Sequence, residues 1–291
     1  MIDRIHLNVK IPSNELYSFA LGQLEGIREL KHRLVPKGNI SISKGKYLTR
    51  LNYYPTKKNL AANIIVATTK KKHRYFQLCL YPSKFKIGEF KKFSESLAMF
   101  FDIFTYENLF TNSRISYVEF AIDSLTHTAH DFIPYRRRCN MSEIFVEHDG
   151  TMGSTYLGST KSDTRFCIYD KKKQLEKSSP VPEKTRTRIE ARLRNVSMPP
   201  CELISKMKNP FLTLQIADLK KAKQLTEEIE WQSFLLRCLE TGSAKALSEL
   251  KKAQRKAFNS RLDSVRASWW NPNYVWKYFE NALLRIAPCK D

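Results

Sequence analysis

The sequences TRFCIY at 164–169 and RTRIEARL at 186–193 decide the predicted fold, because each alternates between two kinds of side chain. This period of two is typical of β-strands, whose successive side chains point to opposite faces of a sheet. On the first strand Tyr169 therefore shares a face with a cysteine and an arginine, and on the second Glu190 lies between two arginines. The residues on these faces are Arg165, Cys167 and Tyr169 on the first strand and Arg188, Glu190 and Arg192 on the second.

The neighbouring segments supply a strand, a turn and a helix. The sequence GTMGSTYLGSTKS at 150–162 predicts a strand and a turn, since Gly153 and Gly158 bracket Thr-Tyr-Leu. The polar residues 170–177 predict a short helix. Two interpretations of Tyr169 stay open, because it is either a half-buried sheet residue beside solvated charges or a reactive group facing a carboxylate. Spacing alone leaves Tyr156 nearly as eligible for a reactive role.

Three ordered motifs resemble the signature of a known family: TYLGSTKS (155–162), RFCIYDKKKQ (165–174) and RIEARLR (188–194). The family is that of plasmid and phage rolling-circle replication initiation factors, the Rep proteins, to which some relaxases of integrative elements are related. The upstream segment YVEFAIDS (117–124) resembles the acidic strand of that family. The resemblance spans about 113–194. The chain differs where the family often has Glu, at Gln174, and where it often has Asp, at Glu119.

The resemblance implies a site-specific, metal-dependent DNA endonuclease and strand transferase that nicks one strand at an origin. A tyrosine would attack the phosphodiester and keep the 5′-phosphate as a covalent ester, leaving a 3′-hydroxyl primer. Carboxylates suit Mg²⁺ or Mn²⁺, since both ions prefer oxygen ligands. Lysines beside the tyrosine, and arginines beside Glu190, would contact phenolate or phosphate. The expected catalytic residues are Tyr169, Lys171, Lys172, Arg188 and Arg192, and the expected metal ligands are Glu119, Asp123 and Glu190.

The amino-acid composition indicates which kind of molecule the protein binds. The chain has 291 residues, 42% of them hydrophobic, and 50 Lys and Arg against 29 Asp and Glu give a formal charge of +21. Such a charge favours nucleic acid, because lysine and arginine displace counterions from phosphates. No apolar run approaches the roughly 20 residues that span a bilayer, and the start of the chain alternates like a strand. Six scattered cysteines suit a reducing compartment, so we expect a cytoplasmic protein without a membrane partner.

Two basic clusters are candidate DNA contacts, each with the alternative of a solvated surface, and Lys161 is a further single candidate. The sequence Lys-Lys-Lys-His at 70–73 predicts the tip of a hairpin, and three arginines at 136–138 predict a basic loop. The expected partners are duplex and single-stranded origin DNA, a host helicase and a second copy of the chain. The candidate DNA-binding residues are Lys70, Lys71, Lys72, Arg136, Arg137, Arg138 and Lys161.

The predicted fold is α+β, a mainly antiparallel sheet covered by helices, like that of HUH relaxases but without a His-x-His motif. Residues 1–200 form the predicted catalytic domain, and 201–291 form a helical region for DNA binding or dimerisation. The alternatives in function are a conjugative relaxase of the same fold and a non-enzymatic origin-binding protein. The predicted strands are 2–11, 39–43, 47–54, 63–68, 74–81, 114–123, 155–157, 164–169 and 186–193, and the predicted helices are 12–32, 88–104, 170–177, 201–208, 218–240, 244–265 and 272–286.

Overall fold

The structure is a computed structural model that forms two compact units, each described here by itself. The predicted DNA contacts Lys70, Lys71, Lys72 and Arg138 lie outside the described residues. The first unit comprises Met1–Glu119, Arg194–Met207 and Phe279–Asp291, and the second comprises Phe120–Leu193 and Lys208–Tyr278. The structure describes residues 1–34, 39–55, 59–69, 73–86, 88–101, 104–137, 139–148, 152–176, 187–284 and 286–287.

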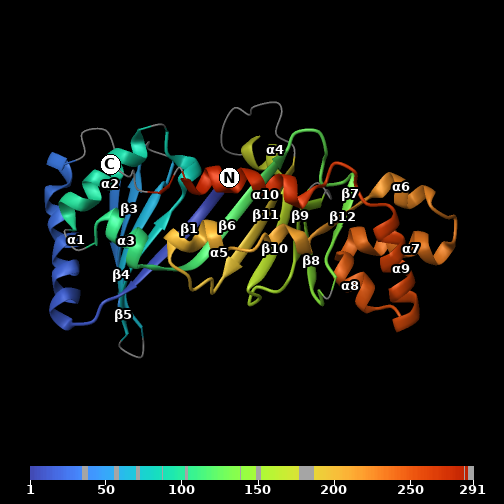
Figure 1. Ribbon diagram of the computed structural model, residues 1–291, viewed down its shortest axis with the longest axis horizontal. Helices are drawn as coiled ribbons and strands as arrows, with labels where there is room; N and C mark the ends of the chain where they lie inside the picture. Colours follow the sequence, from blue (N-terminus) through green and yellow to red (C-terminus); the bar gives the residue numbers. More distant parts are fainter. Residues whose placement is uncertain are drawn as a thin grey trace. The chain divides into compact units, whose positions relative to one another are not determined.

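The first unit contains an antiparallel sheet in the order β2-β3-β4-β5-β1, followed by the start of β6 (Figure 1). Each of these strands was predicted to within about two residues at its ends, β1 from the alternation of its apolar side chains and β4 from a short apolar run. The strands are β1 (Ile2–Lys10), β2 (Asn39–Lys44), β3 (Leu48–Tyr54), β4 (Ala62–Thr68), β5 (Arg74–Leu80) and β6 (Arg114–Ser124).

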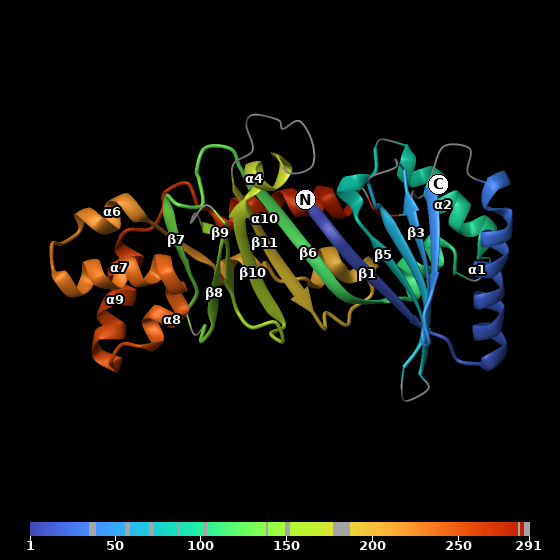
Figure 2. The ribbon, with the colours of Figure 1, turned by 180° about the vertical axis from the view of Figure 1, so that it is seen from behind.

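Helices cover one face of this sheet. In Figure 1, α2 (Glu89–Phe100) and α3 (Tyr106–Asn112) lie in front of the strands, and the view from behind in Figure 2 shows the strands themselves. On the covered face Phe76 of β5 stacks on Phe104 with ring centroids 4.2 Å apart. The predicted helix 88–104 ends early, at Phe100. The remaining helical elements of this unit are α1 (Asn14–Leu34), η1 (Pro82–Lys84), η3 (Pro200–Glu202) and α5 (Leu203–Lys206).

The second unit holds the rest of β6 and then β11, β10, β9 and β8, and the pairs from β11 to β8 are antiparallel. The fold prediction of an α+β protein with a large antiparallel sheet and C-terminal helices is confirmed. Three short strands were not predicted: β7, β8 and β12. The bounds are β7 (Phe132–Tyr135), β8 (Ser142–Val146), β9 (Met152–Leu157), β10 (Thr164–Asp170), β11 (Thr187–Arg194) and β12 (Gln215–Asp218).

The register between β10 and β11 fixes which side chains meet. Cys167 lies opposite Glu190, and Tyr169 lies opposite Arg188. The two predicted strand faces are therefore confirmed, with the polar face carrying tyrosine, carboxylate and guanidinium groups. The other face is apolar and buried: Phe166, Ile168, Ile189 and Ala191 are each 1% exposed or less.

Helices after Lys208 pack on the β7-β12 pair around one apolar cluster that includes Trp231, whose indole donates to the Ala222 carbonyl at 2.8 Å. The predicted helix 218–240 is wrong, because Gln232 bonds the carbonyls of Lys223 and Thr226 and so ends α6. The predicted helix 244–265 is also divided, between α8 and α9. No helix in the described segments is both long and apolar enough to cross a membrane. The bounds are η4 (Pro210–Thr213), α6 (Leu219–Gln224), α7 (Ile229–Thr241), α8 (Ser243–Ser248), α9 (Lys252–Ser264) and α10 (Pro272–Leu284).

Candidate active site

Tyr169, near the end of β10, points at a carboxylate on the neighbouring strand. Its hydroxyl donates to Oε1 of Glu190 at 2.7 Å. The other carboxylate oxygen, Oε2, accepts from Arg192 twice, from Nε at 3.1 Å and from Nη2 at 2.6 Å. Glu190 is only 2% exposed, so the guanidinium supplies the counter-charge that a buried carboxylate requires. Phenol, carboxylate and guanidinium thus form one connected chain.

The Tyr169 phenol is neutral at ordinary pH. Burial, and then the negative charge of Glu190, raise the pKa of Tyr169 well above its usual value of 10. A phenol of this kind reacts as a nucleophile only if a base removes its proton as it attacks. Glu190 already accepts the hydrogen bond from that hydroxyl and is the base in reach.

Three lysines, residues 171–173, form the first turn of α4 (Lys171–Glu176), which begins two residues after Tyr169. Its first turn is capped by the Asp170 side chain, which accepts from the backbone N–H of Lys173 at 3.1 Å. The Lys171 ammonium lies 5.7 Å from the centre of the Tyr169 ring, and Lys172 is exposed. The helix therefore places the Lys171 ammonium group near the Tyr169 ring, and the catalytic roles expected for Lys171 and Lys172 stay predictions.

A small polar cavity of about 210 Å³ opens beside the Tyr169 side chain. Ligand sites for drug-sized molecules usually measure roughly 300–1,000 Å³, so this cavity suits a smaller polar group such as a backbone phosphate. The helical turn after Tyr169 brings Lys173, one of the lysines expected to contact phosphate, and Gln174 to this cavity. Its lining includes Tyr156, Cys167, Tyr169, Lys173, Gln174 and Arg192.

Tyr156, the other candidate nucleophile, lines the same cavity but has different partners. The Arg165 guanidinium lies 4.0 Å above its ring and that of Arg192 lies 5.8 Å away. Burial and the neighbouring Cys167 raise its pKa above 10. Among the described residues no carboxylate bonds to the Tyr156 hydroxyl. Of the two tyrosines at this cavity, Tyr169 is therefore the one whose hydroxyl contacts a carboxylate.

Asp123 and Arg188 form a bidentate ion pair with each other. Arg188 Nε donates to Oδ1 at 2.6 Å and Nη2 to Oδ2 at 2.7 Å. Both carboxylate oxygens of Asp123 accept from this guanidinium, and the Arg188 side chain is 8% exposed. The metal role predicted for Asp123 and the phosphate role predicted for Arg188 stay predictions, and both would have to compete with this pair.

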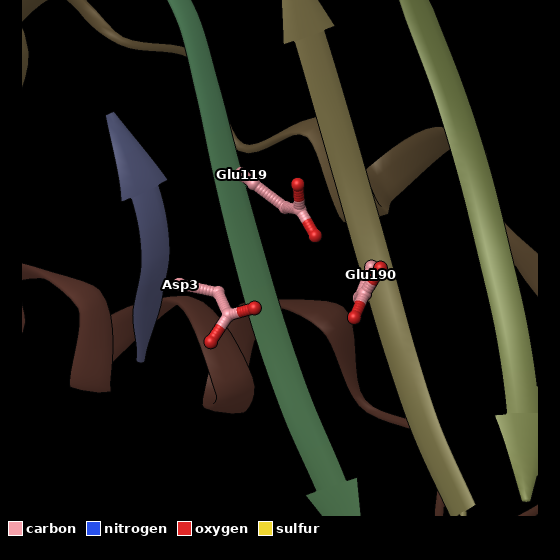
Figure 3. Close-up of side chains that lie close together, drawn as sticks. All are labelled: Asp3, Glu119 and Glu190. Carbon is pink, nitrogen blue, oxygen red and sulfur yellow. The ribbon is translucent and has the colours of Figure 1, made fainter. Parts of the chain in front are cut away.

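In the first unit, Glu119 on β6 is 2% exposed and accepts from the Tyr117 hydroxyl at 2.6 Å. A carboxylate oxygen of Asp3, on β1, lies within 4.8 Å of one of Glu119. Figure 3 labels both residues, together with Glu190 of the second unit. Asp3 was missed by the sequence reasoning, since one acidic residue in an alternating strand gives no signal of its own.

The predicted DNA contacts that the structure describes lie in two loops of the second unit. Arg136 donates to the Thr164 carbonyl at 3.3 Å, and Arg137 pairs with Asp263 of α9. Lys161 is exposed in a tight turn, where its backbone N–H donates to Oγ of Ser159 at 3.1 Å. None of the three contacts the Tyr169 cavity.

Comparisons with known proteins give little information about the function of this chain. No protein-family model and no curated protein matches the chain. A rolling circle replication initiator protein from Geobacillus stearothermophilus is similar over 84% of this chain and 98% of its own, with 11% identity and a TM-score of 0.39. DynU16, from the dynemicin biosynthetic locus, is similar over 88% of this chain and 99% of its own, with 8% identity and a TM-score of 0.23. Both scores are too low to carry information about activity.

Proposed function

We propose that this protein initiates rolling-circle replication by nicking one DNA strand at an origin, with Tyr169 as the nucleophile. The observation that carries the proposal is the hydrogen-bonded chain from the Tyr169 hydroxyl through Glu190 to Arg192. A nucleophile, a base in contact with it and a third group that orients the base are the recurring parts of covalent catalysis. The formal charge of +21 supports DNA as the substrate.

In the proposed step Glu190 takes the phenol proton as the Tyr169 oxygen forms a bond to phosphorus. The bond from phosphorus to the 3′-oxygen breaks, and that oxygen leaves as a 3′-hydroxyl after taking a proton from water. The 5′-phosphate stays on Tyr169. Rejoining is the reverse step, in which a 3′-hydroxyl attacks the phosphotyrosine and Tyr169 recovers its proton from Glu190. Lys171 and Lys173 favour the anionic phosphate near the ring.

The proposal includes a Mg²⁺ or Mn²⁺ ion bound by two carboxylates of the first unit, those of Asp3 and Glu119. Both are oxygen donors, which hard cations prefer, and Glu119 is almost fully buried. When bound, such an ion polarises the scissile phosphate and neutralises its charge. Isothermal titration with Mn²⁺ checks this part independently of cleavage, since Glu119→Gln should weaken binding and an unchanged affinity would remove Glu119 from the site.

The test of the function uses Tyr169→Phe, which keeps the ring and removes only the attacking oxygen. Supercoiled plasmid carrying the origin, or a pool of single-stranded oligonucleotides, is incubated with protein and Mn²⁺ and run on a denaturing gel. We expect a covalent adduct with the wild-type chain, none with Tyr169→Phe, and an undiminished adduct with the matched control Tyr156→Phe. Sequence-selective binding without any adduct would instead favour a non-enzymatic origin-binding protein.

A further inference from the structure

The second unit contains a groove, separate from the Tyr169 cavity, between α9 and the loop after β7. Its volume is about 390 Å³. The lining contributes four cationic side chains, those of Arg136, Arg137, Arg255 and Lys256, against one carboxylate, that of Asp263. We call it the α9 groove and define it by Arg136, Arg137, Lys256, Asn259, Ser260 and Asp263.

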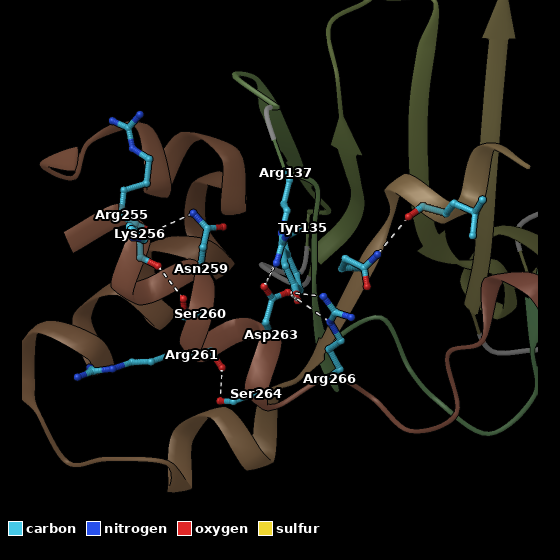
Figure 4. Close-up of polar contacts among 12 residues, drawn as sticks. Tyr135, Arg137, Arg255, Lys256, Asn259, Ser260, Arg261, Asp263, Ser264 and Arg266 are labelled. Carbon is cyan, nitrogen blue, oxygen red and sulfur yellow. Dashed lines mark hydrogen bonds and ion pairs between the residues drawn. The ribbon is translucent and has the colours of Figure 1, made fainter. Parts of the chain in front are cut away.

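The cations of α9 are distributed unequally around the helix (Figure 4). Arg261, which extends to the side opposite Arg137, is neutralised by Glu228 at 2.6 and 2.9 Å and lies 5.6 Å from the Trp231 ring centre. Lys256, on the groove, is exposed, and no described residue pairs with its ammonium group. The helix thus satisfies the charge that faces the core and leaves positive charge on the groove side.

Asp263 fixes the opposite wall of the groove against α9. It pairs with Arg137, accepts from the Tyr135 hydroxyl at 2.7 Å and accepts from Arg266 Nη2 at 2.7 Å, as Figure 4 shows. Burial opposes ionisation of Asp263, but these hydrogen bonds outweigh it and hold its pKa below the usual value. Two arginines already balance this carboxylate, and the Arg137 side chain is still 68% exposed. The ion pair with Asp263 therefore holds the Arg137 side chain in place while leaving it accessible to a ligand.

The GSTKS turn at 158–162 adjoins the groove through a second cavity, which shares Arg136 and Asn140 with it. Gly158 begins the turn with φ +96°, and a Cβ there would lie 2.9 Å from the Thr164 carbonyl oxygen, so the turn requires glycine. Its N–H donates to the Met141 carbonyl at 2.9 Å. The turn that adjoins the groove through this second cavity carries the exposed Lys161, which the proposed chemistry does not use.

From this geometry we infer that the α9 groove binds duplex DNA, with α9 in the major groove and the loops at Arg136–Arg137 and Lys161 on the phosphates. Lys256, Asn259 and Ser260 lie on one face of α9, at positions i, i+3 and i+4. Lysine, asparagine and serine are side chains that contact base edges. A helix of 13 residues is about 20 Å long, enough to lie along a major groove.

Duplex DNA fits this surface better than a single strand. Proteins that bind single strands stack the bases on aromatic side chains, and none of the residues that line the α9 groove is aromatic. The inference rests on the proposed function in taking DNA as the ligand. The duplex form of the DNA and the residues that contact it are inferred from the groove. It places duplex recognition and strand cleavage on different surfaces of the second unit.

The test measures duplex binding by the full chain without divalent metal, so no cleavage is involved. A randomised duplex pool is selected with the wild-type chain and with Asn259→Ala. We expect the variant to lose a base preference of roughly five- to 150-fold at one position. Identical preferences in both chains, or selection of single strands only, would overturn the inference.

Salt dependence gives the second readout. Lys161→Ala should reduce the slope of log affinity against log salt by about 0.9, the value for one phosphate contact on duplex DNA. Lys220→Ala, an equally exposed lysine on α6 outside the groove, is the matched control and should leave the slope unchanged. Equal slopes for the two variants would overturn the phosphate assignment. If the chain selects particular duplexes but no Tyr169 adduct forms, the proposed nicking fails and the groove inference stands. If a Tyr169 adduct forms but no duplex is selected, the groove inference fails and the proposed nicking stands.

Discussion

The β1-β5 pair of the first unit and the β10-β11 pair of the second have the same antiparallel architecture but opposite chemistry on their polar faces. Between β1 and β5 the cross-strand contact is neutral, with Gln77 donating to Asn8 at 2.6 Å. Between β10 and β11, Arg165 lies directly opposite Arg192. Like charges in that position destabilise a sheet.

The carboxylates that compensate these arginines are themselves arranged around tyrosines. Arg165 pairs with Glu143 at 2.6 Å, and Arg192 pairs with Glu190, which also holds Tyr169. A sheet selected for stability alone would avoid such an arrangement, whereas functional sites regularly retain it. The difference teaches that the β10-β11 pair keeps like charges facing each other and compensates them with carboxylates, whereas the β1-β5 pair is joined at this position by a neutral amide contact.

The largest effect is expected from Glu190→Gln. The change removes the base and the negative charge but keeps the size, so adduct formation should fall roughly a hundred- to ten-thousand-fold. Glu143→Gln is the matched control, because it removes the same charge from a carboxylate that pairs with an arginine on the same face. Single-turnover cleavage measured on both variants decides the point, and equal losses would mean that Glu190 acts only as an ion-pair partner.

The next effect concerns stability. Arg188→Ala leaves the carboxylate of Asp123 without its bidentate partner, so we expect a loss of about 3 kcal/mol in the free energy of unfolding by urea. In the first unit, Gln77→Ala breaks a neutral hydrogen bond and should cost only about 1 kcal/mol. Equal losses would remove the contrast between the charged contact and the neutral one.

The predicted metal role of Asp123 can be examined with the same set of variants. If Asp123 ligates the cation, Asp123→Asn weakens Mn²⁺ affinity in isothermal titration. If it serves the Arg188 pair alone, the affinity is unchanged while the free energy of unfolding falls.

The smallest effect is a pH dependence in the first unit. Burial, and then the charge of Arg4, lower the pKa of His6 from 6.5 to about 4. The unfolded chain therefore binds more protons, and the stability from neutral His6 is present above pH 6.5 and lost as the pH falls to about 4. The difference between these two pKa values limits the loss to about 3 kcal/mol, which is reached only below about pH 4. His6→Asn should flatten this limb of the curve of unfolding free energy against pH, and a curve of unchanged slope would contradict it.

Periodicity carried the prediction of the fold a long way. It placed the strands of the first unit, and it put Tyr169 on the same face as Arg165 and Glu190 on the same face as Arg192, as the register shows. The missed strands are short or interrupted, since β12 has four residues and β7 contains Pro134, which is a weak strand signal. The breaks within the predicted helices 218–240 and 244–265 were not predictable from periodicity, because only in the folded chain do the side chains of Gln232 and Arg255 donate to carbonyls at the ends of α6 and α8.

The partners within the site were not predictable in the same way. A period of two gives the face of a strand but not its neighbour or register, so it could not show that Arg188 pairs with Asp123 rather than staying available for phosphate. Nor could it choose between Tyr156 and Tyr169, since both face the same cavity. The choice depends on which hydroxyl meets Glu190, and that is a property of the paired strands.

Mapping the covalent adduct by mass spectrometry tests the central claim most directly. The wild-type chain is reacted with single-stranded oligonucleotides in the presence of Mn²⁺, digested with nuclease and protease, and searched for a peptide that carries a nucleotide phosphate. The modified residue should be Tyr169, and Tyr169→Phe should give no modified peptide. A phosphate on Tyr156, or binding of DNA with no modified tyrosine in the wild-type chain, would contradict the role of the Tyr169–Glu190–Arg192 chain.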